Sequence, residues 1–332
     1  MDMMKAVAVV KDGLADVKVP RPQPGERDLL VRVQAVAVNP VDTIQQPAET
    51  GQAPRVIGWD VAGVVEEVGP KCTLFRPGDE VYYAGDITRP GGFSEYHVVD
   101  ERIVGRKPKT LSFAEAAALP LTSLTAWEGL FEHLGISKQG MAGERVLIVG
   151  AAGGVGSIAT QLANRAGLTV IGTASRPESR DWVLAHGAHH VVVHGQAFEP
   201  QLSELGLYPV DYVFCLNEVH TQWDNMLSAL RPKGRICTIL PPREPLNFRP
   251  MADKSVTWSI EAMFTRAKYR TPDMDAQHRA LSQLANWIDA GEIRTTLAER
   301  RSPICAAQVN IAFAKLRSRR TIGKIVLEGF QD

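Results

Sequence analysis

The sequence contains 332 residues, with 37 Lys and Arg against 37 Asp and Glu, so its formal net charge is zero. This balance excludes a global electrostatic field that would favour nucleic acid or an anionic membrane. No apolar run approaches the ~20 residues that a bilayer requires, and the first residues lead straight into an apolar segment without room for a signal peptide. The length predicts about two domains, and we expect a soluble, cytoplasmic protein.

The part of the chain up to about residue 120 alternates short apolar segments with turns rich in Pro and Gly. Strands are predicted at residues 29–38, 61–68, 80–83 and 94–99. An alanine-rich helix at 114–118 closes this part. The pattern is typical of a compact β-rich barrel.

The chain after residue 145 alternates predicted strands and helices instead. Strands are predicted at 191–193, 210–214 and 234–240, with a helix at 223–230. Such alternation indicates a parallel sheet covered by helices on both faces. Two amphipathic helices, at 276–290 and 306–316, precede a strand at 322–327, and we expect this tail to pack on the first domain.

The most specific feature is a glycine-rich turn between a strand at 145–149 and a helix. Another apolar strand follows at 168–173, which completes a βαβ unit. Glycines allow backbone amides to approach phosphate oxygens, and a helix N-terminus favours an anion. The fingerprint departs from G-x-G-x-x-G because Ala151 replaces the first glycine, so a merely tight connection is the alternative. The turn residues predicted to bind a dinucleotide are Gly153, Gly154, Val155 and Gly156.

The second strand of this unit is followed by Ser175 and Arg176. A protein selective for NAD is expected to carry Asp or Glu at this point for the ribose hydroxyls. A hydroxyl and a guanidinium suit a 2′-phosphate instead, which predicts NADPH as the cofactor. The alternative is that Arg176 is an ordinary solvated residue.

The four cysteines, Cys72, Cys215, Cys237 and Cys305, are scattered through the chain. None of their spacings is short enough to place two thiolates on one metal. The pattern fits a reducing compartment and does not indicate a disulfide framework.

Several motifs, taken in order, resemble the medium-chain dehydrogenase/reductase superfamily, and within it the zinc-independent quinone oxidoreductase branch of zeta-crystallin. They are N-P-V-D at 39–42, G-W-D-V-A-G at 58–63, P-G-D-E-V at 77–81, L-P-L-T-S-L-T-A at 119–126, A-A-G-G-V-G at 151–156 and G-K-I-V-L at 323–327. The resemblance implies an α/β fold, with a Rossmann doubly wound parallel sheet and a GroES-like β-barrel. It implies a GroES-like catalytic domain at 1–121 and 267–332, a Rossmann cofactor-binding domain at 122–266, and a homodimer.

Zinc members of this superfamily have a Cys shortly after the first long strand, a His-Glu pair in the next motif, and a lobe of four cysteines. The corresponding positions here are Asn39, Trp59 and Asp60, and the cysteine lobe is missing. An amide, an indole and one carboxylate cannot form a thiolate and imidazole site. We therefore predict that no metal takes part in catalysis.

Three residues are the catalytic candidates. The amide of Asn39 is a donor for a substrate carbonyl, with a turn residue before Pro40 as the alternative. Asp42, in the same motif, has either a capping or a contact role. Trp59 and Tyr83 are predicted to line a flat apolar pocket, with barrel core as the alternative. A family tyrosine two positions after Asp42 is replaced by Ile44.

The resemblance also supplies candidate cofactor contacts outside the turn. Thr125 matches the family threonine that meets the nicotinamide, and Leu216 and Asn217 end a parallel strand where Rossmann sheets bind their ligand. Phe264 is expected to close the nicotinamide side. Lys324, in the G-K-I-V-L motif, is a further expected contact.

These observations predict an NADPH-dependent oxidoreductase that reduces quinones or α,β-unsaturated carbonyls by hydride transfer without catalytic zinc. One alternative is a zinc-type alcohol dehydrogenase, and the other is a non-catalytic NADPH-binding protein. The expected partner is a small quinone or enone, and neither nucleic acid nor a membrane is expected.

Overall fold

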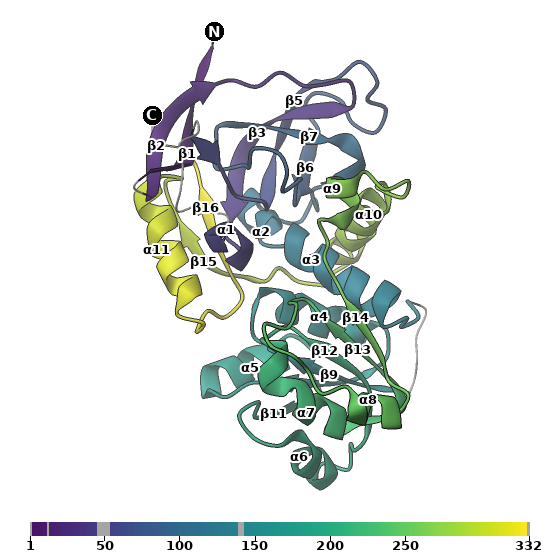
Figure 1. The fold of residues 1–332 in the computed structure, drawn as a ribbon. Coiled ribbons are helices and arrows are strands. Elements are labelled where there is room, and N and C mark those ends of the chain that lie inside the picture. Colours follow the sequence, from purple (N-terminus) through teal and green to yellow (C-terminus); the bar gives the residue numbers. More distant parts are fainter. Residues whose placement is uncertain (1, 12, 45–53, 139–142, 331–332) are drawn as a thin grey trace. The chain divides into compact units, whose positions relative to one another are not determined.

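The computed structural model describes residues 2–11, 13–44, 54–138 and 143–330. It divides into two compact units, one of Met1–Leu121 with Phe264–Asp332 and one of Thr122–Met263 (Figure 1). The second boundary follows Met263, whereas the sequence placed it after residue 266. Within the described residues, no helix has the length and apolar character needed to cross a membrane.

The first unit is a β-rich domain built from both ends of the chain. Its larger sheet has the order β15-β16-β3-β5-β6-β8, and β7 pairs with β3; a smaller sheet has the order β2-β1-β4. The strands are β1 (Met3–Val10), β2 (Gly13–Pro20), β3 (Asp28–Ala37), β4 (Arg55–Val56), β5 (Val61–Val68), β6 (Glu80–Tyr83), β7 (Tyr96–Asp100), β8 (Val104–Arg106), β15 (Leu297–Arg301) and β16 (Lys324–Glu328). Since β16 pairs with β3, the tail completes the first domain, as expected.

Helices pack around this sheet. They are α1 (Pro40–Ile44), α2 (Phe113–Ala117), α9 (Thr265–Tyr269), α10 (Ala276–Asp289) and α11 (Ala306–Arg317). A Cβ on Gly105 of β8 would lie 2.5 Å from Cβ of Leu281 on α10, so glycine permits this helix to pack closely on the strand. The segment after Asn39, expected as a turn, is the short helix α1, because Pro40 suits the first helical position.

The second unit has a six-stranded parallel sheet in the order β11-β10-β9-β12-β13-β14. The strands are β9 (Arg145–Val149), β10 (Thr169–Thr173), β11 (His190–Val192), β12 (Val210–Cys215), β13 (Leu230–Thr238) and β14 (Thr257–Ile260). This is the doubly wound 3-2-1-4-5-6 order of dinucleotide-binding domains, so the predicted fold class is confirmed. The direction in which the chain adds strands reverses between β9 and β12.

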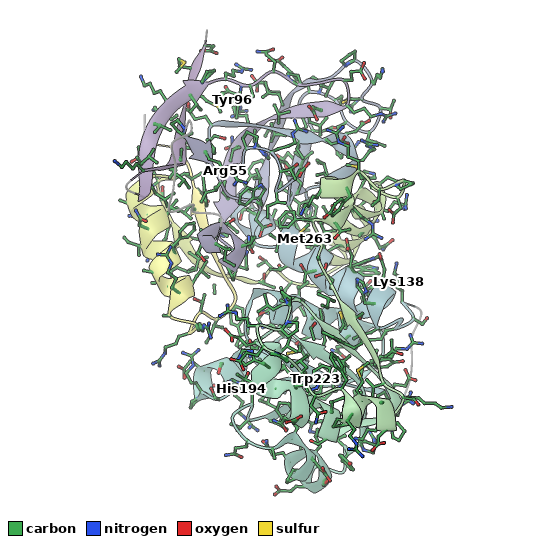
Figure 2. The ribbon with its side chains drawn as sticks, in the orientation of Figure 1. Arg55, Tyr96, Lys138, His194, Trp223 and Met263 are labelled. Atoms are coloured by element: carbon green, nitrogen blue, oxygen red, sulfur yellow. The ribbon has the colours of Figure 1, made fainter. Side chains whose placement is uncertain are left out.

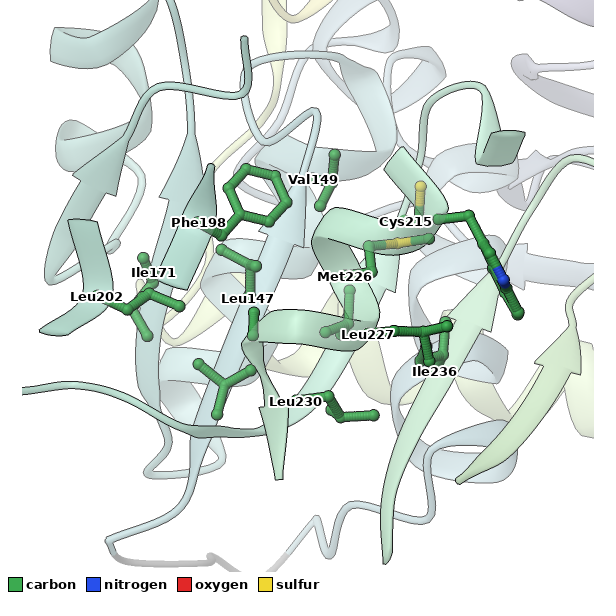
Figure 3. Packing of buried hydrophobic residues seen from close by; sticks show 14 of the residues in the cluster. Leu147, Val149, Ile171, Phe198, Leu202, Cys215, Met226, Leu227, Leu230 and Ile236 are labelled. Carbon is green, nitrogen blue, oxygen red and sulfur yellow. The ribbon is translucent and has the colours of Figure 1, made fainter. Parts of the chain in front are cut away.

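Helices accompany these strands: α3 (Pro120–Trp127), which crosses the boundary between the units, η2 (Glu128–His133), α4 (Gly154–Arg165), α5 (Pro177–Ala185), α6 (Phe198–Glu204), α7 (Val219–Ala229) and α8 (Arg249–Asp253). One face of the sheet meets α6 and α7 through a buried cluster that includes Leu147, Val149, Phe198 and Met226 (Figure 3). Trp223, labelled in Figure 2, closes the cluster against Trp258. The inner strands β9, β10 and β12 are therefore mostly buried, as expected of a parallel sheet covered on both faces.

Candidate functional site

The turn after β9 is joined to the end of β10. Gly150 has φ +90°, a backbone conformation that glycine adopts without strain. Its backbone N–H donates to Oγ1 of Thr173, the last residue of β10, at 2.9 Å. The carboxyl ends of both strands therefore meet at one edge of the sheet, where Gly153 precedes the first turn of α4.

The glycines of this turn have different physical roles. A Cβ on Gly156 would lie 2.4 Å from the carbonyl oxygen of Gly150 and 2.5 Å from Cα of Ala151, so Gly156 permits α4 to pack on the turn. A Cβ on Gly153 would meet nothing nearer than 3.6 Å. The need for a tight connection explains why residue 156 is glycine. It does not explain why residue 153 is glycine, because a side chain there would meet no close atom. The open side of Gly153, at the N-terminus of a twelve-residue helix, suits the approach of a phosphate.

Ser175 and Arg176 follow the end of β10. Ser175 is exposed, and Arg176 immediately precedes α5, where its backbone N–H donates to Oγ of Ser179 at 3.2 Å. The Arg176 guanidinium lies 3.7 Å from the carboxylate of Glu178, and an ion pair of this kind at a surface contributes little to stability. Thr173 is hydrogen-bonded to Gly150 of the glycine turn. Ser175 and Arg176 come two and three residues after Thr173, so they follow the same edge of the sheet as the turn.

The switch point between β9 and β12 supplies the other side of this edge. The backbone N–H of Leu216 donates to the carbonyl of Val149 at 2.9 Å. Next to it, Oδ1 of Asn217 would lie 2.8 Å from a Cβ on Gly150, so the amide side chain lies against the glycine turn. The structure thus gathers Gly150, Gly153 and Asn217 at the position where doubly wound sheets bind ligands.

The remaining predicted cofactor contacts lie elsewhere. Thr125 is buried on α3 of the second unit. Phe264 belongs to the first unit, where its ring meets Trp59 edge-on with centroids 6.5 Å apart. Contact of either residue with a nicotinamide stays a prediction.

The first unit holds a buried polar cluster of Asn39, Asp60 and Lys324. Nζ of Lys324 lies 2.5 Å from Oδ1 of Asn39 and 2.9 Å from Oδ2 of Asp60. It also donates to the carbonyl of Val38 at 3.0 Å. An ammonium has three N–H donors, so all of them are satisfied inside this unit. A cofactor contact by Lys324 stays a prediction, and the cluster is complete without one.

Asp60 is the negative member of this cluster. Its Oδ2 accepts from Nδ2 of Asn39 at 3.0 Å, and its Oδ1 accepts from the backbone N–H of Leu121 at 3.0 Å. Burial raises the pKa of Asp60, while the Lys324 ammonium and these hydrogen bonds oppose the rise. Every partner is a donor, so the cluster matches the ionised carboxylate.

Asp42 lies in the first turn of α1 and is fully buried. Its Oδ2 accepts from the backbone N–H of Asn39 at 2.7 Å, which is the capping role that the sequence left open. Its Oδ1 has no hydrogen-bond partner among the described residues. Burial is the main cause that raises the pKa of Asp42 to about 7; Asp60 adds to the rise, and the Asn39 backbone and Lys324 oppose it.

Trp59 and Tyr83 are both fully buried. The Trp59 Nε1–H donates to the carbonyl of Asp86 at 3.1 Å, and the Arg55 guanidinium, located in Figure 2, lies 5.8 Å from its ring centroid. Tyr82, the strand neighbour of Tyr83, is buried too and donates to the carbonyl of Leu281. These contacts favour the alternative that both candidates are barrel core, and a pocket role for either stays a prediction.

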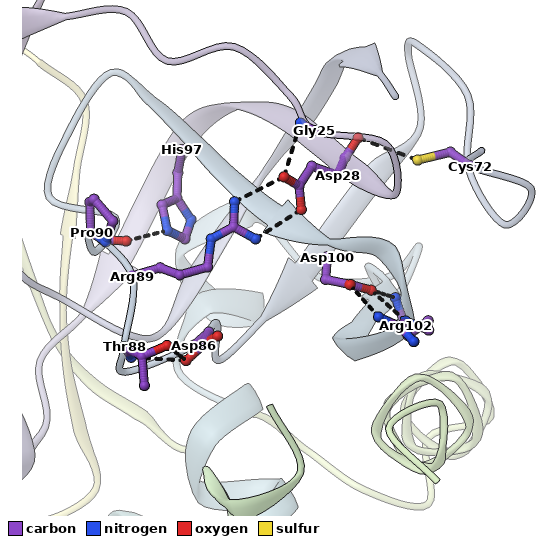
Figure 4. A network of polar contacts seen from close by, with 10 residues as sticks. All are labelled: Gly25, Asp28, Cys72, Asp86, Thr88, Arg89, Pro90, His97, Asp100 and Arg102. Carbon is purple, nitrogen blue, oxygen red and sulfur yellow. Dashed lines mark hydrogen bonds and ion pairs between the residues drawn. The ribbon is translucent and has the colours of Figure 1, made fainter. Parts of the chain in front are cut away.

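The Tyr83 hydroxyl is committed to a partner. It lies 3.0 Å from Nδ1 of His97. Nε2 of the same ring lies 2.9 Å from the carbonyl oxygen of Pro90 (Figure 4). Since a carbonyl only accepts, Nε2 carries the hydrogen, and the Tyr83 O–H donates to Nδ1. Burial lowers the pKa of His97 to about 4, which keeps the ring neutral. Beside it, Arg89 forms a bidentate pair with Asp28 at 2.8 and 3.0 Å.

The side chains present do not fit zinc. No group of three or more His, Cys, Asp or Glu able to hold a metal occurs in the described part of the chain. At the positions of the family ligands, the oxygens of Asn39 and Asp60 already bind the Lys324 ammonium. Zinc favours thiolate and imidazole, and burial raises the pKa of the Cys215 and Cys237 thiols to about 11 and about 12.

Comparison with known families agrees with the fold. Residues 25–109 match the alcohol dehydrogenase GroES-like domain, and residues 186–327 match the zinc-binding dehydrogenase family. The chain belongs to the medium-chain dehydrogenase/reductase superfamily, in its quinone oxidoreductase-like branch. It is an oxidoreductase of a family whose members bind NAD(P).

Two curated relatives and two solved structures illustrate this membership. The chain is 41% identical over 309 residues to a zinc-type alcohol dehydrogenase-like protein of Staphylococcus aureus strain MRSA252, covering 92% of each. It is 37% identical over 205 residues to the quinone oxidoreductase of Mus musculus, covering 59% of this chain and 60% of that protein.

Among structures, it is 46% identical to a Rhizobium etli CFN 42 protein proposed to be a zinc-dependent alcohol dehydrogenase, with TM-score 0.95 and full coverage of both chains. A mycobacterial protein solved with NADPH has 29% identity and TM-score 0.83, covering 98% of this chain and 99% of the other.

The role of Lys324 inside the cluster is the feature that sequence reasoning missed. Lys324 opens β16, and most residues of this strand are buried. A lysine within an otherwise apolar buried strand is a signal, because a buried ammonium needs acceptors. The sequence could not name those acceptors, since Asn39 lies 285 positions away.

Proposed function

We propose that the protein reduces quinones or α,β-unsaturated carbonyls with NADPH and without zinc. NADPH is proposed over NADH because the glycine turn and the end of β10 lie at the same edge of the sheet. The Gly150 to Thr173 bond joins this edge to Ser175 and Arg176. A hydroxyl and a guanidinium favour the 2′-phosphate of NADPH, whereas a carboxylate would favour the ribose hydroxyl of NADH. The mycobacterial structure solved with NADPH supports the same choice.

Two groups of residues would hold this cofactor. The open side of Gly153 and the first turn of α4 suit its diphosphate, and Asn217 lies beside that turn. NADPH would supply the hydride. The protein's own part is to exclude water, to orient the acceptor and to donate a hydrogen bond where negative charge develops.

Asn39 is the proposed donor to the acceptor oxygen. One of its two Nδ2 hydrogens is used by Asp60, and no described residue accepts the other. The side chain is held in place because both of its amide atoms have partners within 3.0 Å. A donor that is already oriented stabilises a developing oxyanion without reorganisation during the reaction.

The zinc-type alcohol dehydrogenase is the second candidate, favoured by the description of the Staphylococcus aureus relative. The donor set described above disfavours it. The third possibility is a protein that binds NADPH without using it.

A screen of NADPH oxidation separates these possibilities. Protein freed of metal would be assayed against a panel of quinones and enones, with NADH in parallel. We expect turnover with NADPH for at least one acceptor. Turnover only after zinc is added would indicate the alcohol dehydrogenase, and tight NADPH binding with no oxidation by any acceptor would indicate the binding protein.

A further inference from the structure

We propose that Lys324 is a positioning residue whose buried ammonium fixes the orientation of the Asn39 amide. The inference deepens the proposed function, because the amide is the proposed donor to the acceptor. It also makes a claim about the resting protein that does not depend on turnover. Lys324 and Asn39 are 4% and 1% exposed, so water competes little with their contact.

The orientation of an amide follows from its partners, since its oxygen only accepts and its nitrogen only donates. Here Oδ1 faces the Lys324 ammonium at 2.5 Å and Nδ2 faces the Asp60 carboxylate at 3.0 Å. Rotating the amide by half a turn would place N–H groups against the ammonium and the oxygen against the carboxylate. Both contacts would then be repulsive, so only one orientation is allowed.

The ammonium acts in two ways. It can only donate hydrogen bonds, so of the two polar atoms of the Asn39 amide it binds the oxygen and not the nitrogen. It also lies 2.9 Å from Asp60 and favours the ionised carboxylate in a buried place. Without the ammonium, burial would favour a protonated Asp60, whose O–H could donate to Oδ1. Both orientations of Asn39 would then be available.

The rest of the local structure holds Asn39 in place for this interaction. Lys324 also donates to the carbonyl of Val38, but the backbone has two further anchors. The Asn39 N–H donates to Asp42, and the Val38 N–H donates to the carbonyl of Ile325 at 3.0 Å. The charge on the amide oxygen's partner also polarises the amide and strengthens its N–H as a donor. Lys324 therefore acts on the acceptor only through Asn39.

A double-mutant cycle tests that statement. We would compare Lys324→Met, Asn39→Ala and the double variant for kcat with the best acceptor and for the Kd of NADPH. Each single substitution is expected to lower kcat by roughly 10²-fold, the size found for one oxyanion donor, while the Kd stays within a few fold. The double variant is expected to lose no more than either single variant. Independent, multiplying losses would overturn the proposal.

Lys107 offers a matched control. It is 8% exposed in the same unit, and its Nζ donates to the carbonyls of Pro108 and Leu111 at 2.9 and 2.6 Å. Lys107→Met removes a buried ammonium without touching Asn39. It is expected to lower thermal stability and to leave kcat unchanged; an equal fall in kcat would mean that Lys324 has only a structural effect.

The side-chain amide signal of Asn39 in the ¹⁵N–¹H NMR spectrum gives a readout without turnover. It is assigned by its loss in Asn39→Ala. In Lys324→Met we expect this signal to shift and its hydrogens to exchange faster, while Lys107→Met leaves it unchanged. An unchanged signal in Lys324→Met would overturn the positioning role. If none of the acceptors supports NADPH oxidation by the wild type, the proposed function fails. The Asn39 signal still decides the role of Lys324 in that case.

Discussion

The backbone N–H of Gly150 donates to the Thr173 hydroxyl at 2.9 Å, and this bond joins the ends of β9 and β10. One strand end carries the glycine turn, and the other leads into Ser175 and Arg176. A diphosphate bound at the turn would therefore bring the adenosine ribose to the side of the sheet where β10 ends. The contact ties the predicted phosphate site to the predicted selectivity site.

Arg176→Ala should weaken NADPH binding by about 1.5 to 3 kcal/mol, the contribution of a charge-assisted hydrogen bond. NADH lacks the 2′-phosphate, so its affinity should hardly change. Isothermal titration calorimetry with both cofactors measures the difference. Arg180→Ala is the matched control, because Arg180 is an exposed arginine in α5, the helix that Arg176 precedes. Equal losses for both cofactors would show that Arg176 does not recognise the phosphate.

Two glycine substitutions separate folding from cofactor approach. In Gly156→Ala the new Cβ would meet backbone atoms at 2.4 and 2.5 Å, so we expect a clear fall in the midpoint of thermal unfolding. In Gly153→Ala the nearest atom is 3.6 Å away, so the protein should fold normally. The methyl group would instead obstruct the phosphate, and the Kd for NADPH should rise at least about tenfold. Unimpaired NADPH binding by a folded Gly153→Ala protein would contradict the proposed site.

Much of the fold could be predicted because hydrophobic periodicity identifies strands directly. The predicted strands at 61–68 and 80–83 coincide with β5 and β6. The edge strand β14, Thr257–Ile260, was missed because none of its residues is buried and only two of them are apolar, so it lacks the apolar run of the inner strands. The helix α7 begins at Val219 rather than at residue 223, since the polar residues at its start lack an apolar stripe.

The candidate site was predictable where its residues lie in one βαβ unit, or where the rule that ligands bind at the carboxyl ends of parallel strands applies, as for Asn217. The glycine turn and the residues after β10 belong to one βαβ unit, so spacing alone placed them at one edge. The cluster in the first unit joins Asn39 to Asp60 and Lys324, which lie 21 and 285 positions away. No local pattern records such a contact, because it depends on the pairing of β16 with β3.

We expect acceptor reduction to survive removal of metals. The reason is that Lys324 occupies the oxygens of Asn39 and Asp60, and no thiolate or imidazole lies among them. Turnover would be measured before and after dialysis against a chelator, with zinc content determined on the same samples. Stoichiometric zinc, lost together with activity and restored with it, would refute this prediction.

Asp42 should make the stability of the protein depend on pH. Its pKa is raised from 3.8 to about 7, chiefly by burial, so the folded state binds its proton more tightly than the unfolded state. The stabilising contribution is then complete below pH ~4 and declines as the pH rises to about 7. Three pKa units correspond to roughly 4 kcal/mol, which is the upper limit for the change.

Asp42→Asn removes this titration and keeps an oxygen that can accept from the Asn39 backbone N–H. Relative to the wild type, the variant should therefore gain unfolding free energy as the pH rises from 4 to 7.5. His97, whose pKa is lowered to about 4, contributes with the opposite sign, because its neutral form is buried. It is present in both proteins and cancels in their difference. Urea unfolding at a series of pH values measures that difference, and a difference independent of pH would mean that Asp42 titrates normally in the folded protein.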